Sequence, residues 1–158
     1  MCVGFIDLVG STALAERLST REFGAVLTEF ENLTADTITA AGGRVIKLIG
    51  DEVLYTAGNE QTACEIALDL ITQLAEHPRV PAVRAGVARG DVLLRDGDVF
   101  GPVVNLAARA VKLAGPSELL APPTVAQSAR LRAESLTSQS LKGFDGTIQL
   151  CRVVRDSA

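Results

Sequence analysis

The sequence has few cysteines, no excess of basic residues and no long apolar run, and each shortage excludes a class of protein. Its three cysteines, Cys2, Cys64 and Cys151, lack C-x-x-C spacing, which argues against a zinc site or a disulfide framework and fits buried thiols in a reducing cytoplasm. Nineteen acidic residues against fifteen Lys and Arg give a net charge of −4, so we expect no nucleic-acid-binding face. The longest apolar stretches, such as residues 2–6, are far shorter than the roughly 20 residues of a membrane span, so we expect no membrane contact by this segment.

The length and composition are those of one globular domain. The chain has 158 residues, of which 47% are hydrophobic and 22% charged, a balance typical of a folded domain rather than a disordered chain. A chain of this size buries roughly 70% of its unfolded surface around a single core. We therefore expect a single domain over residues 1–158, either as a whole short protein or as the end of a longer one.

Hydrophobic periodicity predicts an alternation of short strands and amphipathic helices. The predicted elements are a strand at 2–8, a helical region at 11–41 interrupted at 19–20, a hairpin at 44–49 and 52–56, a helix at 60–76, a strand pair within 80–94 bent near 89–91, a helix at 100–114, a strand at 118–121, a small helix after 123, and a final hairpin at 138–141 and 148–154. We expect Gly42-Gly43 to end the long helix and Gly50-Asp51 to form the first hairpin turn. This order predicts an α+β, ferredoxin-like sandwich with helices packed on one mainly antiparallel sheet. The single histidine, His77, falls in a loop without an evident orienting partner, so we expect it to be solvated.

Two aspartates are candidate metal ligands because of where they stand relative to predicted strands. Asp7 ends the apolar run of the first strand, and Asp51 lies at the tip of a hairpin that could sit beside that strand. Carboxylates that converge at strand ends are the ligands that Mg²⁺ or Mn²⁺ prefers when the ion is shared with substrate phosphates. Alternatively, Asp7 caps the next helix or is simply the first solvated residue beyond the core.

Three further features suggest groups that bind an anion or a base. Gly10, Ser11 and Thr12 open a predicted helix, where free backbone N–H groups can face an anion, although the G-K-[ST] of a Walker A loop is missing. Lys47 interrupts an apolar strand, either to protect a sheet edge from aggregation or to donate to a ring nitrogen or carbonyl. Asp98 lies in a D-G-D turn, where it is either ordinary turn chemistry or a polar group of the same site.

Asn105 and Arg109 form a polar pair on an otherwise apolar predicted helix. They are four residues apart and therefore project from one helical face. The pair either makes a hydrogen bond within the helix or at the surface, or supplies a hydroxyl-orienting amide and a guanidinium for phosphate charge. Lys142 is a third possible phosphate cation, or else an isolated loop lysine.

Taken together, four motifs closely resemble the class III nucleotidyl cyclase catalytic domain. They are FIDLVGST at 5–12, RVIKLIGDEV at 44–53, DVFGPVVNLAAR at 98–109 and Leu-Lys-Gly at 141–143. Their order and spacing match over nearly the whole chain, whereas any one of them alone is weak evidence. The resemblance therefore implies the dimeric fold and the site of that family.

The resemblance also implies a role for each matched residue. Asp7, Asp51 and the Leu8 backbone carbonyl would bind metal, Lys47 and Asp98 would bind adenine, Asn105 and Arg109 would act on the ribose and the transferred phosphate, and Val9, Gly10, Ser11, Thr12 and Lys142 would bind the phosphates. One departure is Ser11, where many members carry Phe. Because this position follows the metal aspartate and leaves the carboxylate untouched, we interpret it as a subfamily trait.

The reaction that the resemblance implies is the conversion of ATP to 3′,5′-cyclic AMP and pyrophosphate with two divalent cations, Mg²⁺ or Mn²⁺. In this family the site is shared between two catalytic domains. A chain that carries all of these groups is therefore expected to form a homodimer with two equivalent sites in the cytoplasm. In a longer chain, a regulatory domain is a further possible partner.

Three alternatives remain open at this point. A catalytically silent, nucleotide-binding regulatory module of the same fold would be expected to lack a metal aspartate or the arginine, and both are present. A guanylyl cyclase would need other residues at 47 and 98. A diguanylate cyclase shares a Gly-Asp-Glu run with residues 50–52, but this chain lacks the Gly before it and the Phe after it.

Overall fold

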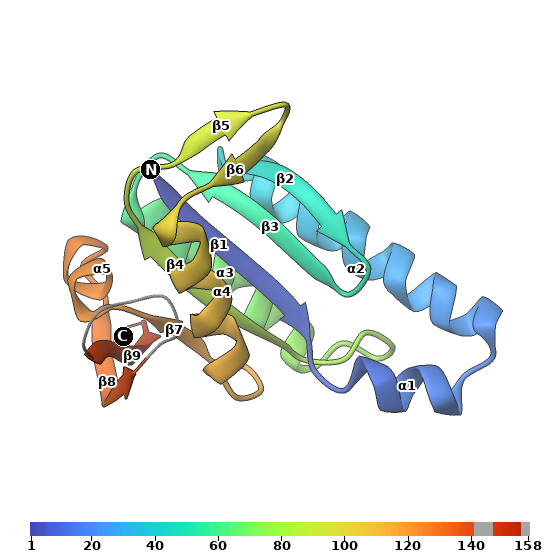
Figure 1. Cartoon of the computed structure of the whole chain (residues 1–158). Helices are drawn as coiled ribbons and strands as arrows, with labels where there is room; N and C mark the ends of the chain where they lie inside the picture. The colour runs from blue at the N-terminus through green and yellow to red at the C-terminus, as the bar shows by residue number, and fades with distance from the viewer. Residues whose placement is uncertain (141–146, 156–158) are drawn as a thin grey trace.

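The fold is built on one seven-stranded sheet, shown in Figure 1, within the described residues 1–140 and 147–155 of the computed structural model. The strands are β1 (Cys2–Leu8), β2 (Arg44–Ile49), β3 (Glu52–Ala57), β4 (Val83–Arg89), β5 (Leu93–Arg95), β6 (Asp98–Phe100), β7 (Leu119–Ala121), β8 (Arg132–Ser140) and β9 (Thr147–Val154). The helices are α1 (Ser11–Arg17), α2 (Thr20–Ala40), α3 (Glu60–Ala75), α4 (Pro102–Leu113) and α5 (Pro123–Ser128). The sheet order is β2-β3-β1-β4-β7-β9-β8, and every neighbouring pair is antiparallel except β4 and β7. None of the described helices is both long and apolar enough to cross a membrane.

The side chains of β1 alternate between two apolar layers, one on each face of the sheet. Ile6 belongs to the larger layer, which includes residues of α2 and α3, whereas Val3 and Phe5 pack with residues of α4. Figure 1 shows α4 on one side of the sheet and α2 and α3 on the other. The α+β class with a mainly antiparallel sheet is confirmed, with helices on both faces. Asp7, two residues beyond Phe5, continues the face that α4 covers.

Local signals place several element boundaries as predicted. The Ser19 hydroxyl accepts a hydrogen bond from the Glu22 amide at 3.1 Å, and the Glu22 carboxylate accepts one from the Ser19 amide, so a capping box begins α2. Gly42 follows α2 with φ +87°, and Gly50 turns the β2–β3 hairpin with φ +63°. Both backbone conformations favour glycine, which explains why the two turns could be read from the sequence.

The predicted strand pair within residues 80–94 is wrong in its pairing. β4 lies inside the seven-stranded sheet between β1 and β7, whereas β5 leaves that sheet and pairs with β6 in a separate hairpin. Asp96 and Gly97 turn this hairpin with φ of +52° and +79°. The D-G-D signal therefore marks a turn between strands, and Asp98 is the first residue of β6 rather than part of the turn itself.

The expectation that His77 is solvated and unpartnered is also wrong. Its imidazole Nδ1 accepts hydrogen bonds from the amides of Arg79 and Val80 at 3.1 and 2.9 Å, and its Nε2 lies 3.2 Å from Glu29 Oε1. The side chain is only 18% exposed. Glu29 lies on α2, 48 residues earlier in the sequence, so the partner that orients this histidine comes from tertiary packing.

Candidate active site

Asp7 and Asp51 lie at the same end of neighbouring strands. Asp7 stands opposite Glu52 of β3 and opposite Arg84 of β4, and Asp51 immediately precedes β3. The Leu8 amide donates to the Asp51 carbonyl at 3.0 Å, which ties the β2–β3 turn to the end of β1. The two predicted metal-binding aspartates are therefore brought to one edge of the fold.

The sequence suggested that Asp7 lies at an exposed strand end, and this expectation is wrong. The Asp7 carboxylate is bound by Arg84. The Arg84 Nε and Nη2 both donate to Asp7 Oδ2, at 2.9 and 2.8 Å, and the Asp7 side chain is only 15% exposed. The third guanidinium nitrogen, Nη1, donates to the Lys112 carbonyl of α4 at 3.0 Å. Arg84 was missed by the sequence analysis, although an arginine inside an apolar strand gives the same kind of signal as Lys47.

Asp51 has a partner in the segment that follows β1. The Ser11 hydroxyl donates to Asp51 Oδ2. The expectation for position 11 concerned Asp7, whereas this contact is made to the other predicted metal-binding aspartate, Asp51, and was not expected from the sequence. Val9 belongs to the loop that the resemblance assigns to phosphate binding, and its amide donates to the Ala82 carbonyl at 3.0 Å. Phosphate binding by this loop stays a prediction.

Glu52 adds a third carboxyl group beside the two aspartates, and Arg84 offsets part of their charge. Burial, and then the charge of nearby Asp7, raise the pKa of Glu52 above its ordinary value. No group of three or more His, Cys, Asp or Glu side chains in the described residues has the arrangement of a metal centre. Two carboxylates suit an ion that takes its other ligands from substrate phosphates and water, which is how proteins usually bind Mg²⁺. The donor set is compatible with the predicted ions, and the Leu8 carbonyl stays a predicted ligand.

Lys47 and Asp98 are brought together although 51 residues separate them. The Lys47 Nζ donates to Asp98 Oδ2 at 2.9 Å, joining edge strand β2 to the β5–β6 hairpin. Asp98 Oδ1 also accepts from the Val99 amide at 2.8 Å. The Lys47 ammonium, and then this backbone hydrogen bond, hold the pKa of Asp98 below its ordinary value. The pair presents one cationic donor and one anionic acceptor side by side, with the Lys47 side chain 45% and the Asp98 side chain 30% exposed.

Asn105 and Arg109 project from α4 without a side-chain partner in the described residues. Asn105 is exposed and Arg109 is half-buried. No hydrogen bond or ion pair between described residues joins either side chain to the aspartates or to Lys47. Lys142 lies outside the residues that the structure describes. Within the described residues, the hydrogen bonds and ion pairs therefore join Asp51 to Ser11 and Lys47 to Asp98, but do not join these groups to Asn105 or Arg109.

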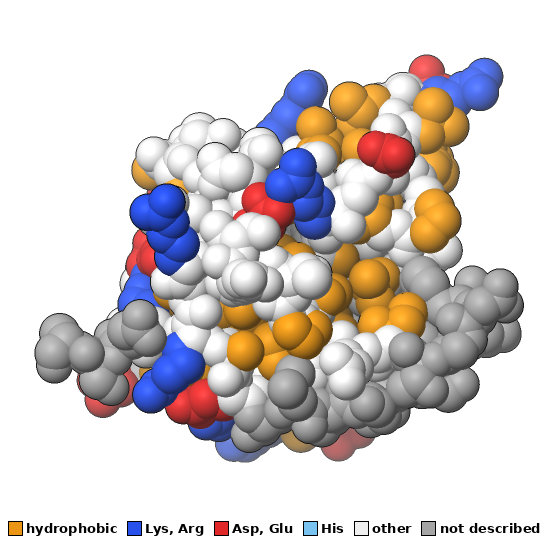
Figure 2. Space-filling model, turned by 90° about the vertical axis from the view of Figure 1, so that its left-hand side faces the viewer, with side chains coloured by type: hydrophobic (Ala, Val, Ile, Leu, Met, Phe, Trp, Pro, Cys, Tyr) orange, Lys and Arg blue, Asp and Glu red, His pale blue; other side chains and the backbone are white. Residues whose placement is uncertain are grey.

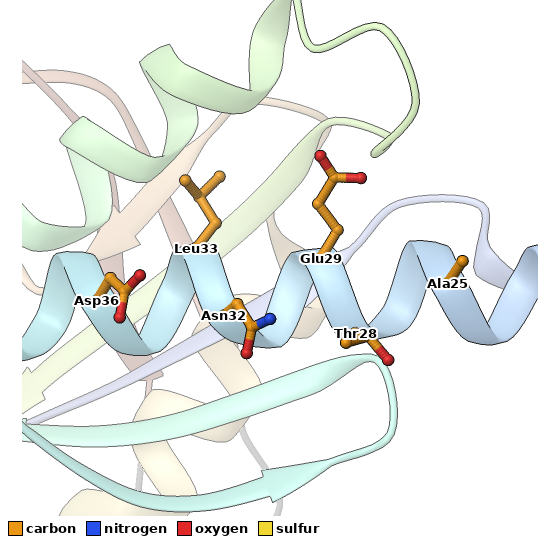
Figure 3. A pocket seen from close by; sticks show the side chains of 6 residues that line it. All are labelled: Ala25, Thr28, Glu29, Asn32, Leu33 and Asp36. Carbon is orange, nitrogen blue, oxygen red and sulfur yellow. The ribbon is translucent and has the colours of Figure 1, made fainter.

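A surface hollow of about 520 Å³ along α2 is separate from these clusters (Figure 3). Its lining residues are Ala25, Thr28, Glu29, Asn32, Leu33 and Asp36. Figure 3 shows Glu29 and Leu33 pointing to the opposite side of α2 from Thr28 and Asn32. None of the predicted site residues lines this hollow, so it does not contribute to the candidate active site.

The model of the adenylate and guanylate cyclase catalytic domain matches residues 1–149. The chain belongs to this family. The resemblance to class III nucleotidyl cyclases is thereby confirmed. An adenylate cyclase from Streptomyces coelicolor is 47% identical over 114 residues, which cover 72% of this chain and 30% of that protein. An adenylate cyclase from Glutamicibacter nicotianae is 41% identical over 145 residues, or 91% of this chain and 36% of that protein. The chain therefore spans about a third of the length of these curated relatives.

Solved structures of cyclase domains share the fold. The catalytic core of a rhodopsin-guanylyl cyclase with converted specificity, in complex with ATPαS, has a TM-score of 0.89 and 22% identity, covering 98% of this chain and 94% of that one. The adenylyl cyclase CyaB from P. aeruginosa has a TM-score of 0.85 and 21% identity, covering 99% and 94%. At these identities the likeness establishes the cyclase fold and leaves the choice of nucleotide to the residues of this chain.

Proposed function

We propose that this cyclase domain is an adenylyl cyclase that converts ATP to 3′,5′-cyclic AMP and pyrophosphate. The observation that carries the proposal is the Lys47–Asp98 pair. Lys47 can only donate a hydrogen bond, and ionised Asp98 can only accept one. Adenine presents a ring-nitrogen acceptor and an exocyclic amino donor, which complement the pair. Guanine presents O6 and a protonated N1 instead, and would leave Asp98 facing an oxygen.

Asp7 and Asp51, with the Leu8 carbonyl, are the residues that we propose hold two Mg²⁺ or Mn²⁺ ions. When bound, such ions activate the ribose 3′-hydroxyl and offset charge on the attacking and leaving oxygens. Asp51 is fixed from two sides by Leu8 and Ser11, so its carboxylate is oriented before substrate arrives. No protein nucleophile is needed, because the ribose oxygen itself attacks the α-phosphorus.

Asn105 and Arg109 would act on the nucleotide from the other chain of a homodimer. Asn105 would orient the ribose, and Arg109 would stabilise charge on the transferred phosphate. Within one chain neither side chain contacts the carboxylates, which supports a site completed by a partner. Figure 2 shows hydrophobic side chains on the surface beside charged ones. Leu93, Leu94 and Phe100 of the β5–β6 hairpin are 58%, 56% and 49% exposed, so a partner chain could cover them.

We propose that residues 1–158 form one catalytic domain, which acts in the cytoplasm.

A direct assay tests the proposal. Purified protein is incubated with ATP and Mn²⁺, and cyclic AMP is separated from other products. Wild-type protein is expected to form cyclic AMP, and Asp7→Ala or Asp51→Ala is expected to remove turnover while melting curves show that both variants still fold. A wild-type chain that binds ATP without turnover would instead support the silent regulatory module. A variant with near-normal activity would show that its aspartate is not an essential ligand.

A further inference from the structure

Asp51 is held from two directions by the segment that follows β1. Its carbonyl accepts a hydrogen bond from the Leu8 amide at 3.0 Å, and its carboxylate accepts one from the Ser11 hydroxyl. The first contact fixes the backbone of the β2–β3 turn, and the second fixes the rotation of the side chain. Among the described residues, Ser11 is the only side chain that donates to this carboxylate.

The local backbone explains how Ser11 reaches Asp51. Gly10 precedes α1 with φ +72°, a backbone conformation that favours glycine, and Ser11, the first residue of α1, lies within hydrogen-bond distance of Asp51 in the β2–β3 turn. The Ser11 hydroxyl donates to Asp51 Oδ2. Its single proton is therefore committed to the carboxylate.

A small side chain at position 11 also leaves space beside the contact. A cavity of about 350 Å³ adjoins the pair, and its lining residues are Ser11, Thr12, Ala15, Phe23, Leu27, Gly50 and Asp51. A side chain without a donor group at position 11 could not make this contact, because an ionised carboxylate only accepts hydrogen bonds. The contact is therefore a property of chains that carry a hydroxyl here.

We propose that Ser11 is a positioning residue that orients the Asp51 carboxylate for a divalent cation. The hydroxyl occupies one lone pair of Oδ2 and leaves Oδ1 and the other Oδ2 lone pair available to the ion. Groups that orient a metal ligand in this way typically change metal affinity by roughly 10- to 100-fold when removed. This inference shares one assumption with the proposed function, namely that Asp51 binds the cation.

The test compares four variants by Mn²⁺ binding and by activity. Ser11→Ala removes the donor, Ser11→Cys keeps the size but is a weak donor, and Ser11→Thr keeps the hydroxyl. Ser128→Ala is the matched control, because Ser128 is exposed at the end of α5 and its hydroxyl has no partner among the described residues. Bound Mn²⁺ is measured on the nucleotide-free protein by electron paramagnetic resonance, with Asp51→Ala defining the signal that belongs to this site.

We expect Ser11→Ala and Ser11→Cys to weaken Mn²⁺ binding by roughly tenfold, whereas Ser11→Thr and Ser128→Ala bind like wild type. The Mn²⁺ concentration for half-maximal activity should rise in parallel. Melting temperatures without metal should stay unchanged, which separates positioning from a structural role.

Equal Mn²⁺ affinity in all Ser11 variants would overturn the proposal. So would a Ser11→Thr variant as weak as Ser11→Ala, or a wild-type chain without Mn²⁺ binding that depends on Asp51. A protein that shows the expected binding series but forms no cyclic AMP would refute the proposed function and leave the role of Ser11 standing.

Discussion

Gly86 of β4 packs directly against the backbone of Val111 in α4. A Cβ at Gly86 would lie 2.4 Å from the Val111 amide nitrogen and 2.6 Å from the Ala107 carbonyl oxygen. Both distances are far below van der Waals contact, and backbone cannot move aside as the end of a side chain can. The position of α4 on the sheet, and with it that of Asn105 and Arg109, therefore depends on a glycine at this site.

The Gly86→Ala substitution is expected to destabilise the fold and to lower activity. Overpacking of this kind costs about 1–3 kcal/mol, and displacement of α4 would move Arg109 away from its working position. Gly24→Ala is the control, because Gly24 is an exposed residue of α2 with nothing near the added methyl, and the substitution should be stabilising by about 0.5–1 kcal/mol. Denaturant unfolding and kcat measure both effects. An unchanged denaturant midpoint for Gly86→Ala would show that α4 can shift without a loss in the free energy of unfolding.

The Lys47–Asp98 pair predicts the choice of base. Wild-type protein should prefer ATP over GTP by roughly 100-fold or more in kcat/KM, because bound guanine would cover Asp98 and Lys47 and leave both without a matching hydrogen-bond partner. Asp98→Asn replaces an acceptor by an amide that also donates, so kcat/KM for ATP should fall by roughly 10-fold or more. Asp96→Asn, two residues away in the exposed turn, should leave it unchanged.

The pH dependence of this pair has a definite sign. Lys47 lowers the pKa of Asp98, so the acceptor stays ionised down to pH values below the ordinary range of an aspartate and is lost only as the pH falls further. ATP affinity should therefore not decline through protonation of Asp98 between about pH 7 and 5.

The preference for ATP has its own contradicting outcome. Comparable turnover of GTP and ATP at neutral pH would refute the assignment of the Lys47–Asp98 pair to adenine.

The parts of the fold that could be predicted are those with local signals. The Ser19 capping box begins α2, and Gly42 and Gly50 adopt the positive φ that their turns require. Lys47 lies on a strand, and Asn105 and Arg109 lie on a helix, as the periodicity predicted. Each of these features is specified by residues within a few positions of one another, which a single sequence displays.

The parts that could not be predicted depend on contacts between distant residues. Arg84 is 77 positions from Asp7, Ser11 is 40 from Asp51, and Glu29 is 48 from His77. β5 looked like a partner of β4 because it follows closely in sequence, but the Asp96-Gly97 turn pairs it with β6. Periodicity and spacing predict which elements form, whereas partners of single polar groups follow only once the strand order is known.

The burial of the three cysteines predicts that their thiols react slowly in the folded protein. All three are buried and free, as the sequence suggested, and burial raises the pKa of Cys64 to about 12 and that of Cys2 to about 11. Burial also raises the pKa of Cys151. Because the thiolate is the reactive form, the native protein should react very slowly with a thiol reagent at pH 8, and all three thiols should react in denaturant. Rapid labelling of even one thiol in the native protein would contradict this packing.

A shared active site predicts complementation between two inactive variants. In an isologous dimer, the Asp7 and Asp51 cluster of one chain faces the Asn105 and Arg109 surface of α4 in the other. Asp7→Ala and Arg109→Ala homodimers should both be inactive, because every site carries one lesion. A mixed dimer places both lesions in one site and leaves the other site whole.

Mixing equal amounts of Asp7→Ala and Arg109→Ala should therefore restore about a quarter of wild-type activity, since half of the dimers are mixed and each has one of two sites intact. The matched control mixes Asp7→Ala with Asp51→Ala. These lesions belong to the same half of the site, so each site of the mixed dimer lacks one carboxylate and no activity should return. Native mass spectrometry establishes that subunits have exchanged in both mixtures. If exchange is complete and the first mixture stays as inactive as the second, the active site is not shared between two chains. Asp7 and Arg109 then act within one chain.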